Sequence, residues 1–277
     1  MKKVIVASCI LMLSAGVFAQ DAADKKVQAG IVFGGGLAMQ KMGTNYIQTN
    51  GVGSDLTIGA NVNFGLTETI AFCTGLEFDF ENLKYRAANY NGNNVYYWYN
   101  DKEMLPIGDH DPNDANHNLF EMTERSHKVM YLTLPTMMVF RTNFIGYFRY
   151  FGKFGLRNSF LLSNTITDRG FNLDPNVPMG AKSPATNENM KAGGEMFFFK
   201  SAVGLAGGAE WNFSGSTSLV AEIGYYYGFT PLHANRNTTK GKNYTYASPL
   251  DNGIGNDTQF NNKATQSQLQ LKISVLF

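Results

Sequence analysis

The last ten residues, Gln268-Leu269-Gln270-Leu271-Lys272-Ile273-Ser274-Val275-Leu276-Phe277, decide the fold class. Positions 269, 271, 273, 275 and 277 are apolar, and positions 268, 270, 272 and 274 are polar. A period of two places these two sets on opposite faces of a β-strand. A soluble protein rarely ends on an exposed Phe. A terminal Phe is suitable for a strand that closes a barrel in a lipid bilayer, because its side chain can face the lipid.

The other end of the chain has the pattern of a secretion signal. Met1-Lys2-Lys3 is basic, Val4–Leu13 is apolar, and small residues lead to Val17-Phe18-Ala19. These features predict a cleaved signal peptide over residues 1–19 and a mature outer-membrane barrel over residues 20–277. The apolar run is too short to span a bilayer as a helix, so we expect the exported chain to be released from it.

The composition agrees with an exported β-protein. The 277 residues include 23 Lys+Arg and 22 Asp+Glu, and loss of two signal lysines leaves 21 basic against 22 acidic residues. This balance gives no reason to expect nucleic acid as a partner. Cys73 is the single cysteine of the mature chain, which excludes an internal disulfide. No mature segment has 18 consecutive apolar residues, which excludes transmembrane helices, and abundant Gly and aromatic residues favour a barrel.

Eight segments alternate apolar and polar residues with a period of two. Their ranges are 28–39, 55–64, 69–84, 128–140, 147–162, 196–213, 218–229 and 268–277. One face is bulky and often aromatic, whereas the other collects Gly, Asn, Glu, Lys and Arg. Pro135 falls inside the fourth segment, where it removes a ladder donor and indicates a local bulge. The even number of strands is typical of bacterial outer-membrane barrels.

Short and long connections alternate strictly along the chain. The short links are 65–67, 141–146 and 214–217, and the long polar links are 40–54, 85–127, 163–195 and 230–264. Outer-membrane barrels have short periplasmic turns and longer outside loops. The pattern therefore predicts an all-β fold, an eight-stranded antiparallel transmembrane up-and-down β-barrel with long extracellular loops. Its location would be the outer membrane of a Gram-negative cell.

A soluble eight-stranded barrel such as a lipocalin is the main alternative, because it hides its apolar face inside. The polar face argues against it, since so many charges could not line a site for an apolar ligand. An eight-stranded barrel has room inside only for side chains. We therefore predict that the lumen is plugged by ion pairs, with no wide pore. The charged residues expected there are Glu77, Asp79, Glu81, Glu210, Glu222, Arg149, Lys153, Arg157 and Lys200.

Catalytic and metal-binding patterns are weak. The four histidines, His110, His117, His127 and His233, lie in or beside predicted loops. Ser126 and His127 are sequence neighbours, so they point to different faces of a strand and do not form a catalytic pair. Calcium binding by residues 109–117 stays open but is disfavoured, because an EF-hand loop needs Gly and Glu where this chain has Asp114 and Phe120. We predict no catalytic, cofactor-binding or metal-binding residues, and no cofactor.

Residues 87–101, with the sequence AANYNGNNVYYWYND, are rich in Tyr, Asn and Trp. Such side chains suit recognition of a protein or glycan, because they combine large contact area with adaptable hydrogen bonds. The other interpretation is that Tyr96, Tyr97, Trp98 and Tyr99 belong to the outer aromatic girdle and to loop packing. Cys73 faces inward, and we expect it to be a small buried filler.

Several motifs resemble a known family. Tyr131-Leu132-Thr133-Leu134-Pro135, followed by Tyr150-Phe151-Gly152-Lys153-Phe154-Gly155, resembles the YLxIPxLxK…YxxxG pattern of an outer-membrane β-barrel domain common in Bacteroidetes, which includes PorT-like proteins. Gly204–Trp211 and Glu222-Ile223-Gly224-Tyr225 look like its GxGxE…ExxY region, and Phe277 matches its last residue. The resemblance implies insertion by the barrel-assembly machinery through the C-terminal strand. PorT itself is associated with type IX secretion.

These observations predict a monomeric, non-enzymatic outer-membrane barrel that binds a partner or has a structural role in the membrane. The role could be linked to protein secretion or surface assembly. The expected partners are outer-membrane lipid, the barrel-assembly machinery at the strand ending in Phe277, and a protein or glycan at the extracellular loops. The alternatives are a small outer-membrane enzyme that acts on lipid or peptide, and a narrow solute channel.

Overall fold

The computed structural model describes residues 27–107, 109, 111, 114–174, 182–214, 217–233, 243–248, 258–260 and 263–277. The predicted signal peptide over residues 1–19 and His110 lie outside these ranges. Within them, no helix is long and apolar enough to cross a membrane.

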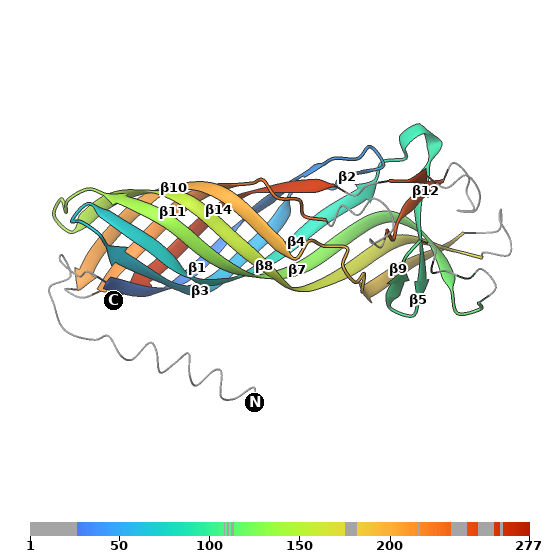
Figure 1. The fold of residues 1–277 in the computed structure, drawn as a ribbon, viewed down its shortest axis with the longest axis horizontal. Helices are drawn as coiled ribbons and strands as arrows, with labels where there is room; N and C mark the ends of the chain where they lie inside the picture. The colour runs from blue at the N-terminus through green and yellow to red at the C-terminus, as the bar shows by residue number, and fades with distance from the viewer. Residues whose placement is uncertain are drawn as a thin grey trace, which may run out of the picture.

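Eight strands form one closed antiparallel ring (Figure 1). In ring order they are β1 (Val27–Met42), β3 (Gly53–Gly65), β4 (Ile70–Ala87), β7 (Asn118–Arg141), β8 (Phe148–Leu173), β10 (Phe199–Ser214), β11 (Thr217–Gly228) and β14 (Ala264–Leu276). The ring closes where β14 pairs with β1, from Gly30 opposite Leu276 to Met42 opposite Ala264. Each of the eight predicted segments overlaps one of these strands, with differences of up to three residues where a segment starts or ends outside its strand, so the predicted barrel is confirmed.

The two faces of the ring differ as the alternation predicts. Large apolar side chains are exposed on the outside, including Phe33, Phe154 and Leu271, because this face meets lipid. On β4 these lipid-facing side chains run from Ile70 to Phe80. This length matches the roughly 9–11 residues that a tilted strand needs to span a bilayer. Because Phe80 and Met130 are partners, we define the membrane-spanning parts as 70–80 on β4 and 130–140 on β7.

Strands β7 and β8 continue far beyond the lipid-facing band. They contain 24 and 26 residues, whereas the sequence predicted strands that begin at Lys128 and end at Leu162. Their outer ends pair with each other and carry further strands at the end of the barrel opposite the C-terminus (Figure 1). We call this part the extension. Its added elements are β2 (Ile47–Thr49), η1 (Tyr90–Gly92), β5 (Asn94–Asn100), β6 (Glu103–Leu105), β9 (Ser183–Met190), β12 (Tyr246–Ser248) and β13 (Thr258–Gln259).

The expected bulge at Pro135 is wrong. Pro135 stays in register opposite Arg157 on β8. Toward β4, the β4–β7 pairing is interrupted at Pro135 and resumes in the same register. Proline has no backbone N–H, so the hydrogen bond at this position is absent and no extra residue is inserted. The irregularities of β7 against β8 lie elsewhere, between Met122 and Glu124 and between Met130 and Tyr131.

Candidate functional site

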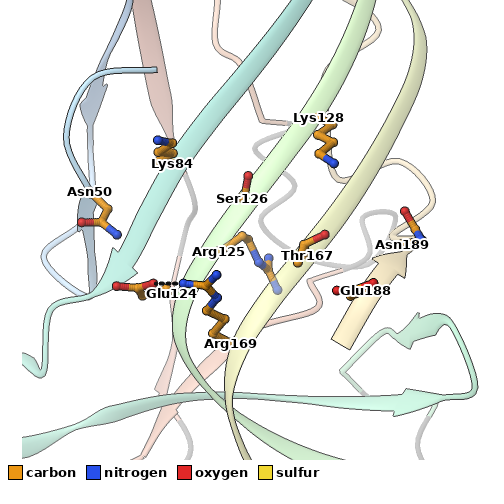
Figure 2. A pocket seen from close by; sticks show the side chains of 10 residues that line it. All are labelled: Asn50, Lys84, Glu124, Arg125, Ser126, Lys128, Thr167, Arg169, Glu188 and Asn189. Atoms are coloured by element: carbon orange, nitrogen blue, oxygen red, sulfur yellow. Dashed lines mark ion pairs between the residues drawn. The ribbon is translucent and has the colours of Figure 1, made fainter. Parts of the chain in front are cut away.

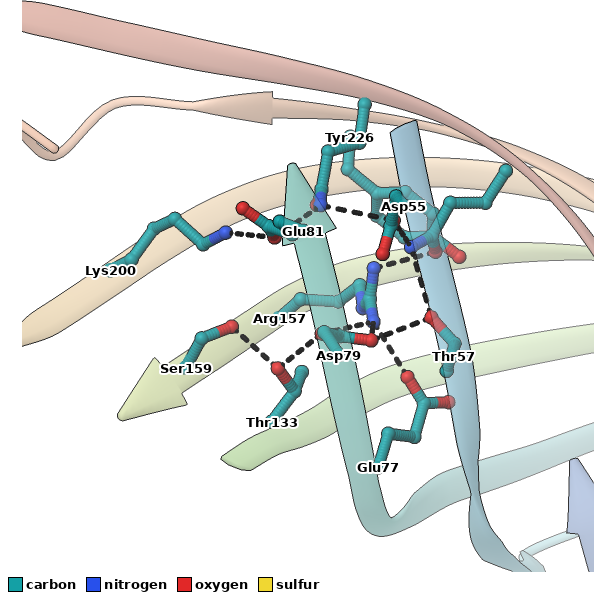
Figure 3. Close-up of polar contacts among 12 residues, drawn as sticks. Asp55, Thr57, Glu77, Asp79, Glu81, Thr133, Arg157, Ser159, Lys200 and Tyr226 are labelled. Carbon is teal, nitrogen blue, oxygen red and sulfur yellow. Dashed lines mark hydrogen bonds and ion pairs between the residues drawn. The ribbon is translucent and has the colours of Figure 1, made fainter. Parts of the chain in front are cut away.

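The middle of the lumen is held by one guanidinium between two carboxylates (Figure 3). Arg157 Nη2 lies 2.7 Å from Glu77 Oε2 and 2.9 Å from Asp79 Oδ2, and Arg157 Nη1 donates to Gln270 Oε1 at 2.6 Å. Lys272 Nζ lies 2.8 Å from both carboxylate oxygens of Glu77. All five side chains are buried. Buried charges need such partners, because an unpaired charge inside the barrel would be costly.

Toward the extension, amide side chains of β14 complete the network. Lys200 Nζ contacts Glu81, whose carboxylate also accepts hydrogen bonds from Gln268 Nε2 at 2.7 Å and Gln266 Nε2 at 3.0 Å. Gln268 donates to Asp55 as well, at 3.2 Å. The sequence placed Asp55 and Gln268 on the polar faces of their strands, whereas Gln266 precedes the predicted segment 268–277. Period alone did not show which residues these side chains would meet.

Two more ion pairs fill the end with the short turns. Arg149 forms a two-pronged contact with Glu210, with Nε–Oε2 and Nη2–Oε1 distances of 2.7 and 2.9 Å. Lys153 pairs with Glu222. All nine charged residues that the sequence assigned to the lumen therefore take part in ion pairs there. The prediction of a charge-filled lumen is confirmed.

Little space is left around these side chains. A cavity of about 20 Å³ lies among Glu77, Lys153 and Arg157, which is room for about one water molecule. The ring of Tyr226 covers this region, with the Arg157 guanidinium 4.7 Å from its centroid. Gly204 makes room for that ring, because a Cβ at Gly204 would lie 2.2 Å from a Tyr226 ring carbon. The lumen of the membrane-spanning part is therefore packed with side chains.

The extension has an apolar core of its own above this charged region. Its buried residues lie mainly on β4, β5, β6, β7, β8 and β9, and include Leu83, Tyr85, Val95, Tyr97, Met104, Phe120, Met122, Val129, Ile166 and Met190. One ion cluster crosses this core. Arg125 Nε and Nη2 each lie 2.8 Å from Asp168, and Arg125 Nη1 lies 3.1 Å from Glu195. Burial raises the pKa of Asp168, while the Arg125 guanidinium opposes that rise.

Four of the five aromatic residues of the 87–101 segment are packed within the extension, whereas Tyr90 is exposed. Tyr96, Tyr97 and Trp98 are buried, and Tyr97 lies 5.2 Å from Phe120 between ring centroids. Tyr99 is partly buried and donates a hydrogen bond to Asn172 at 3.1 Å. Loop packing is therefore the correct interpretation for these four residues, and they do not form a free contact surface.

Ser126 and His127 lie on different faces of β7, as their adjacent positions predict. The Ser126 hydroxyl donates to Asn82 Oδ1 at 2.6 Å on the outer face, whereas His127 is buried and its Nδ1 lies 3.1 Å from Asn164 Oδ1. His127 also lies against His233, with ring centroids 5.6 Å apart. Burial lowers the pKa of His127 to about 3, so this imidazole is neutral at physiological pH.

The acidic stretch 109–117 is a hydrogen-bonded turn in its described residues. Asp114 Oδ1 accepts from the backbone N–H of Asn116 at 2.9 Å, and Asp114 Oδ2 lies 3.5 Å from His117 Nε2. In the described ranges, no group of three or more His, Cys, Asp or Glu side chains is placed to hold a metal ion. Cys73 is buried and forms no disulfide.

Comparison with known proteins identifies the family. Residues 18–234 match the model of a family described as outer membrane protein beta-barrel domain. No curated protein matches the chain. Similar solved structures include Ail of Yersinia pestis, with 10% identity over 91% of this chain and 100% of that chain and a TM-score of 0.33. OprG of Pseudomonas aeruginosa has 10% identity over 92% and 98% of the two chains and a TM-score of 0.37. The finer similarity to PorT-like proteins of Bacteroidetes stays a prediction.

The family model covers more than half of the chain, and the closed ring with its lipid-facing band is the architecture that the family name describes. The short turns lie at the periplasmic end of such barrels and the long connections lie outside the cell. The chain therefore belongs to the outer membrane protein beta-barrel domain family and is a multi-pass β-barrel of the cell outer membrane.

Proposed function

We propose that this protein is a non-conducting, non-enzymatic barrel that presents its folded extension outside the cell to a binding partner. The observation that carries the proposal is the change in the barrel interior along its axis. Ion pairs fill the membrane-spanning part, and an apolar core fills the extension above it. A barrel whose interior is filled in both the membrane-spanning part and the extension offers no continuous path for solute. Its function is then expected to depend on its outer surface.

The rigidity of the extension supports a binding role. Strand β5 is bonded to both β7 and β12, and β9 is bonded to β8. A surface built on strands loses less conformational freedom on binding than a surface of free loops. The partner that we expect is a protein or a glycan at the cell surface, and the wider role could be secretion or surface assembly.

Surface cross-linking tests the binding role. Residues 88–117 would be replaced by a short Gly/Ser linker, which removes β5 and β6 but keeps the β4–β7 pair at Arg86 and Glu124. We expect the variant to assemble in the outer membrane and to lose cross-linked partners that the intact protein captures. An identical set of partners on both proteins, with both correctly assembled, would refute the proposal.

Conductance separates this proposal from a channel. Intact protein in planar bilayers is expected to show no steady current, because the cavity near Arg157 has room for about one water molecule. Replacing Arg157 and Glu77 together by Gly would empty the middle of the lumen, but this variant is also expected to show no steady current, because the apolar core of the extension still closes the path. A steady current through the intact protein would favour the channel alternative.

A further inference from the structure

The outer face of the barrel changes character just above the membrane, on three adjacent strands. Strand register places side chains of β4, β7 and β8 in four successive rows on this face. From the membrane outward the rows are Phe80–Met130–Ser163, Asn82–Lys128–Thr165, Lys84–Ser126–Thr167 and Arg86–Glu124–Arg169. The first row continues the lipid-facing apolar band, and cations appear in each of the three rows above it.

Two adjoining hollows follow these rows. The lower one has a volume of about 400 Å³ and is lined by Phe80, Met130 and Lys128, among others. The upper one has a volume of about 470 Å³ and is lined by Lys84, Ser126 and Lys128, among others (Figure 2). Because both hollows reach Lys128, they form one groove that is apolar at the membrane and polar above it.

Neighbouring elements build the two walls of the upper hollow. Asn50 follows β2, and its backbone N–H donates to the carbonyl of Lys84 at 3.0 Å, which fixes one wall against β4. Glu188 and Asn189 form the other wall, in the irregular part of β9 where its register against β8 shifts. Asn189 has a φ of 58°, a left-handed conformation that few residues other than Gly adopt. The groove is therefore framed by hydrogen-bonded backbone.

The charge of the groove is available to a ligand. Lys84 and Lys128 are exposed, and neither forms an ion pair among the residues that the structure describes. Lys84 lies opposite Ser126, and Lys128 is two residues further along the same face of β7. Diagonal neighbours of this kind are about 7–8 Å apart, so two long lysine side chains can meet at one anionic group between them. Arg169 adds a third cation, and its Nη1 lies 3.7 Å from Oε2 of Glu124.

We propose that this groove binds a phosphorylated lipid of the outer leaflet, with a phosphate between Lys84 and Lys128 and an acyl chain along Phe80 and Met130. The order of the groove matches the order of such a lipid, since the apolar end lies at the level of the membrane and the cations lie at the level of the headgroups. Charge-assisted hydrogen bonds from lysine to phosphate are among the stronger polar contacts. Basic residues next to a bilayer are a recurring means of recognising anionic lipids.

Native mass spectrometry of the full chain in detergent would test the proposal, with bis-phosphorylated lipid A as the probe and its dephosphorylated form as the comparison. The variant is Lys84→Gln with Lys128→Gln. We expect the intact protein to retain the phosphorylated probe at least about tenfold more tightly than the dephosphorylated one, and the double variant to lose that preference. The binding should also weaken as salt is raised, because both lysines are exposed.

The matched control is Lys41→Gln, an exposed lysine just above the apolar band on β1, away from the groove. It should bind the phosphorylated probe as the intact protein does. Equal retention of both probes by the intact protein, or equal loss of binding in the control and the double variant, would overturn the proposal. Inorganic pyrophosphate that competes as strongly as the lipid would show a simple anion site and would overturn the acyl-chain part.

Discussion

The membrane-spanning part and the extension are built on the same strands but are opposite in polarity. On β4, the outward side chains change from Phe78 and Phe80 to Lys84, while the inward ones change from Glu81 to Leu83. On β7 the outward face changes at the same height, where Lys128 follows Met130. Below this level lipid is outside and charge is inside. Above it water is outside and an apolar core is inside.

The height at which the apolar and polar faces exchange shows what determines the alternation of apolar and polar residues along these strands. A β-strand always offers two faces, and the solvent around the barrel decides which one must be apolar. In the bilayer the outer face must satisfy lipid, so the polar residues turn inward and must find partners there. In water the apolar residues return inside. The row Asn82–Lys128–Thr165, between the rows of Phe80 and Lys84, therefore marks the outer boundary of the membrane.

The largest effect is expected from breaking the charged interior. Arg157→Met removes the cation that Glu77 and Asp79 share and leaves two buried carboxylates close together. Loss of one partner from a buried ion pair typically costs about 3–5 kcal/mol. Urea unfolding in lipid vesicles would measure this change for the whole barrel. Arg169→Met is the control, because that guanidinium is on the surface and should leave stability nearly unchanged. Equal stability of the two variants would contradict the comparison.

Breaking the apolar interior should act locally. Phe120→Ala empties a fully buried position beside Tyr97 and should destabilise the extension by about 3 kcal/mol. Hydrogen exchange is expected to quicken in β5 and β6 while the membrane-spanning pairs of β4 with β7 stay protected. Phe78→Ala, which alters a lipid-facing side chain, should leave exchange in the extension unchanged. Faster exchange over the entire barrel in Phe120→Ala would show that the two parts open together.

Low pH should also destabilise the extension more than the membrane-spanning part. The pKa of His127 is about 3 in the folded extension, against about 6.5 when the segment opens, so the opened form binds the proton more strongly. Stability from this group is complete above pH 6.5 and falls as the pH drops toward 3, by about 2 kcal/mol at pH 5. His127→Gln should lose less stability between pH 7.5 and 5 than the intact protein, measured by exchange in β7. Identical pH profiles would contradict this assignment.

The smallest effect is expected on the outer surface of the extension. Glu124→Gln removes the partner of Arg169, but the two groups lie 3.7 Å apart and their side chains are 48% and 73% exposed. Exposed pairs of this kind contribute about 0–1 kcal/mol. Urea unfolding of this variant should match that of the intact protein. A loss as large as that of Phe120→Ala would mean that the surface stabilises the extension as much as its core does.

The sequence was sufficient for the barrel because lipid and a narrow lumen both impose a simple rule. Period two identified all eight ring strands, and limited space predicted that Glu77 and Arg157 would find partners. The extension was not predicted, because the alternation of apolar and polar residues breaks down there. Leu119, Phe120, Glu121 and Met122 are all buried, since the extension covers both faces of β7, and four buried residues in a row show no alternation.

The groove at the membrane boundary could not be predicted for a different reason. Lys84 and Lys128 belong to strands separated by 30 residues of connection, and only the register of β4 with β7 places them at neighbouring positions. Asp168 illustrates the same limit inside the extension. A buried carboxylate there depends on Arg125, a partner on another strand that hydropathy does not reveal.

The glutamines of β14 give the end of the chain a role in the order of assembly. Gln266, Gln268 and Gln270 reach across the lumen to Glu81 and Asp55, which lie on β4 and β3. A sheet that lacks its final strand would expose these carboxylates without their amide donors, and Lys272 would be missing beside Glu77 as well. Pairing of β14 with β1 therefore closes the barrel and supplies the partners of the buried carboxylates in the same step. A barrel that has not closed lacks these partners as well as the backbone hydrogen bonds of its last strand.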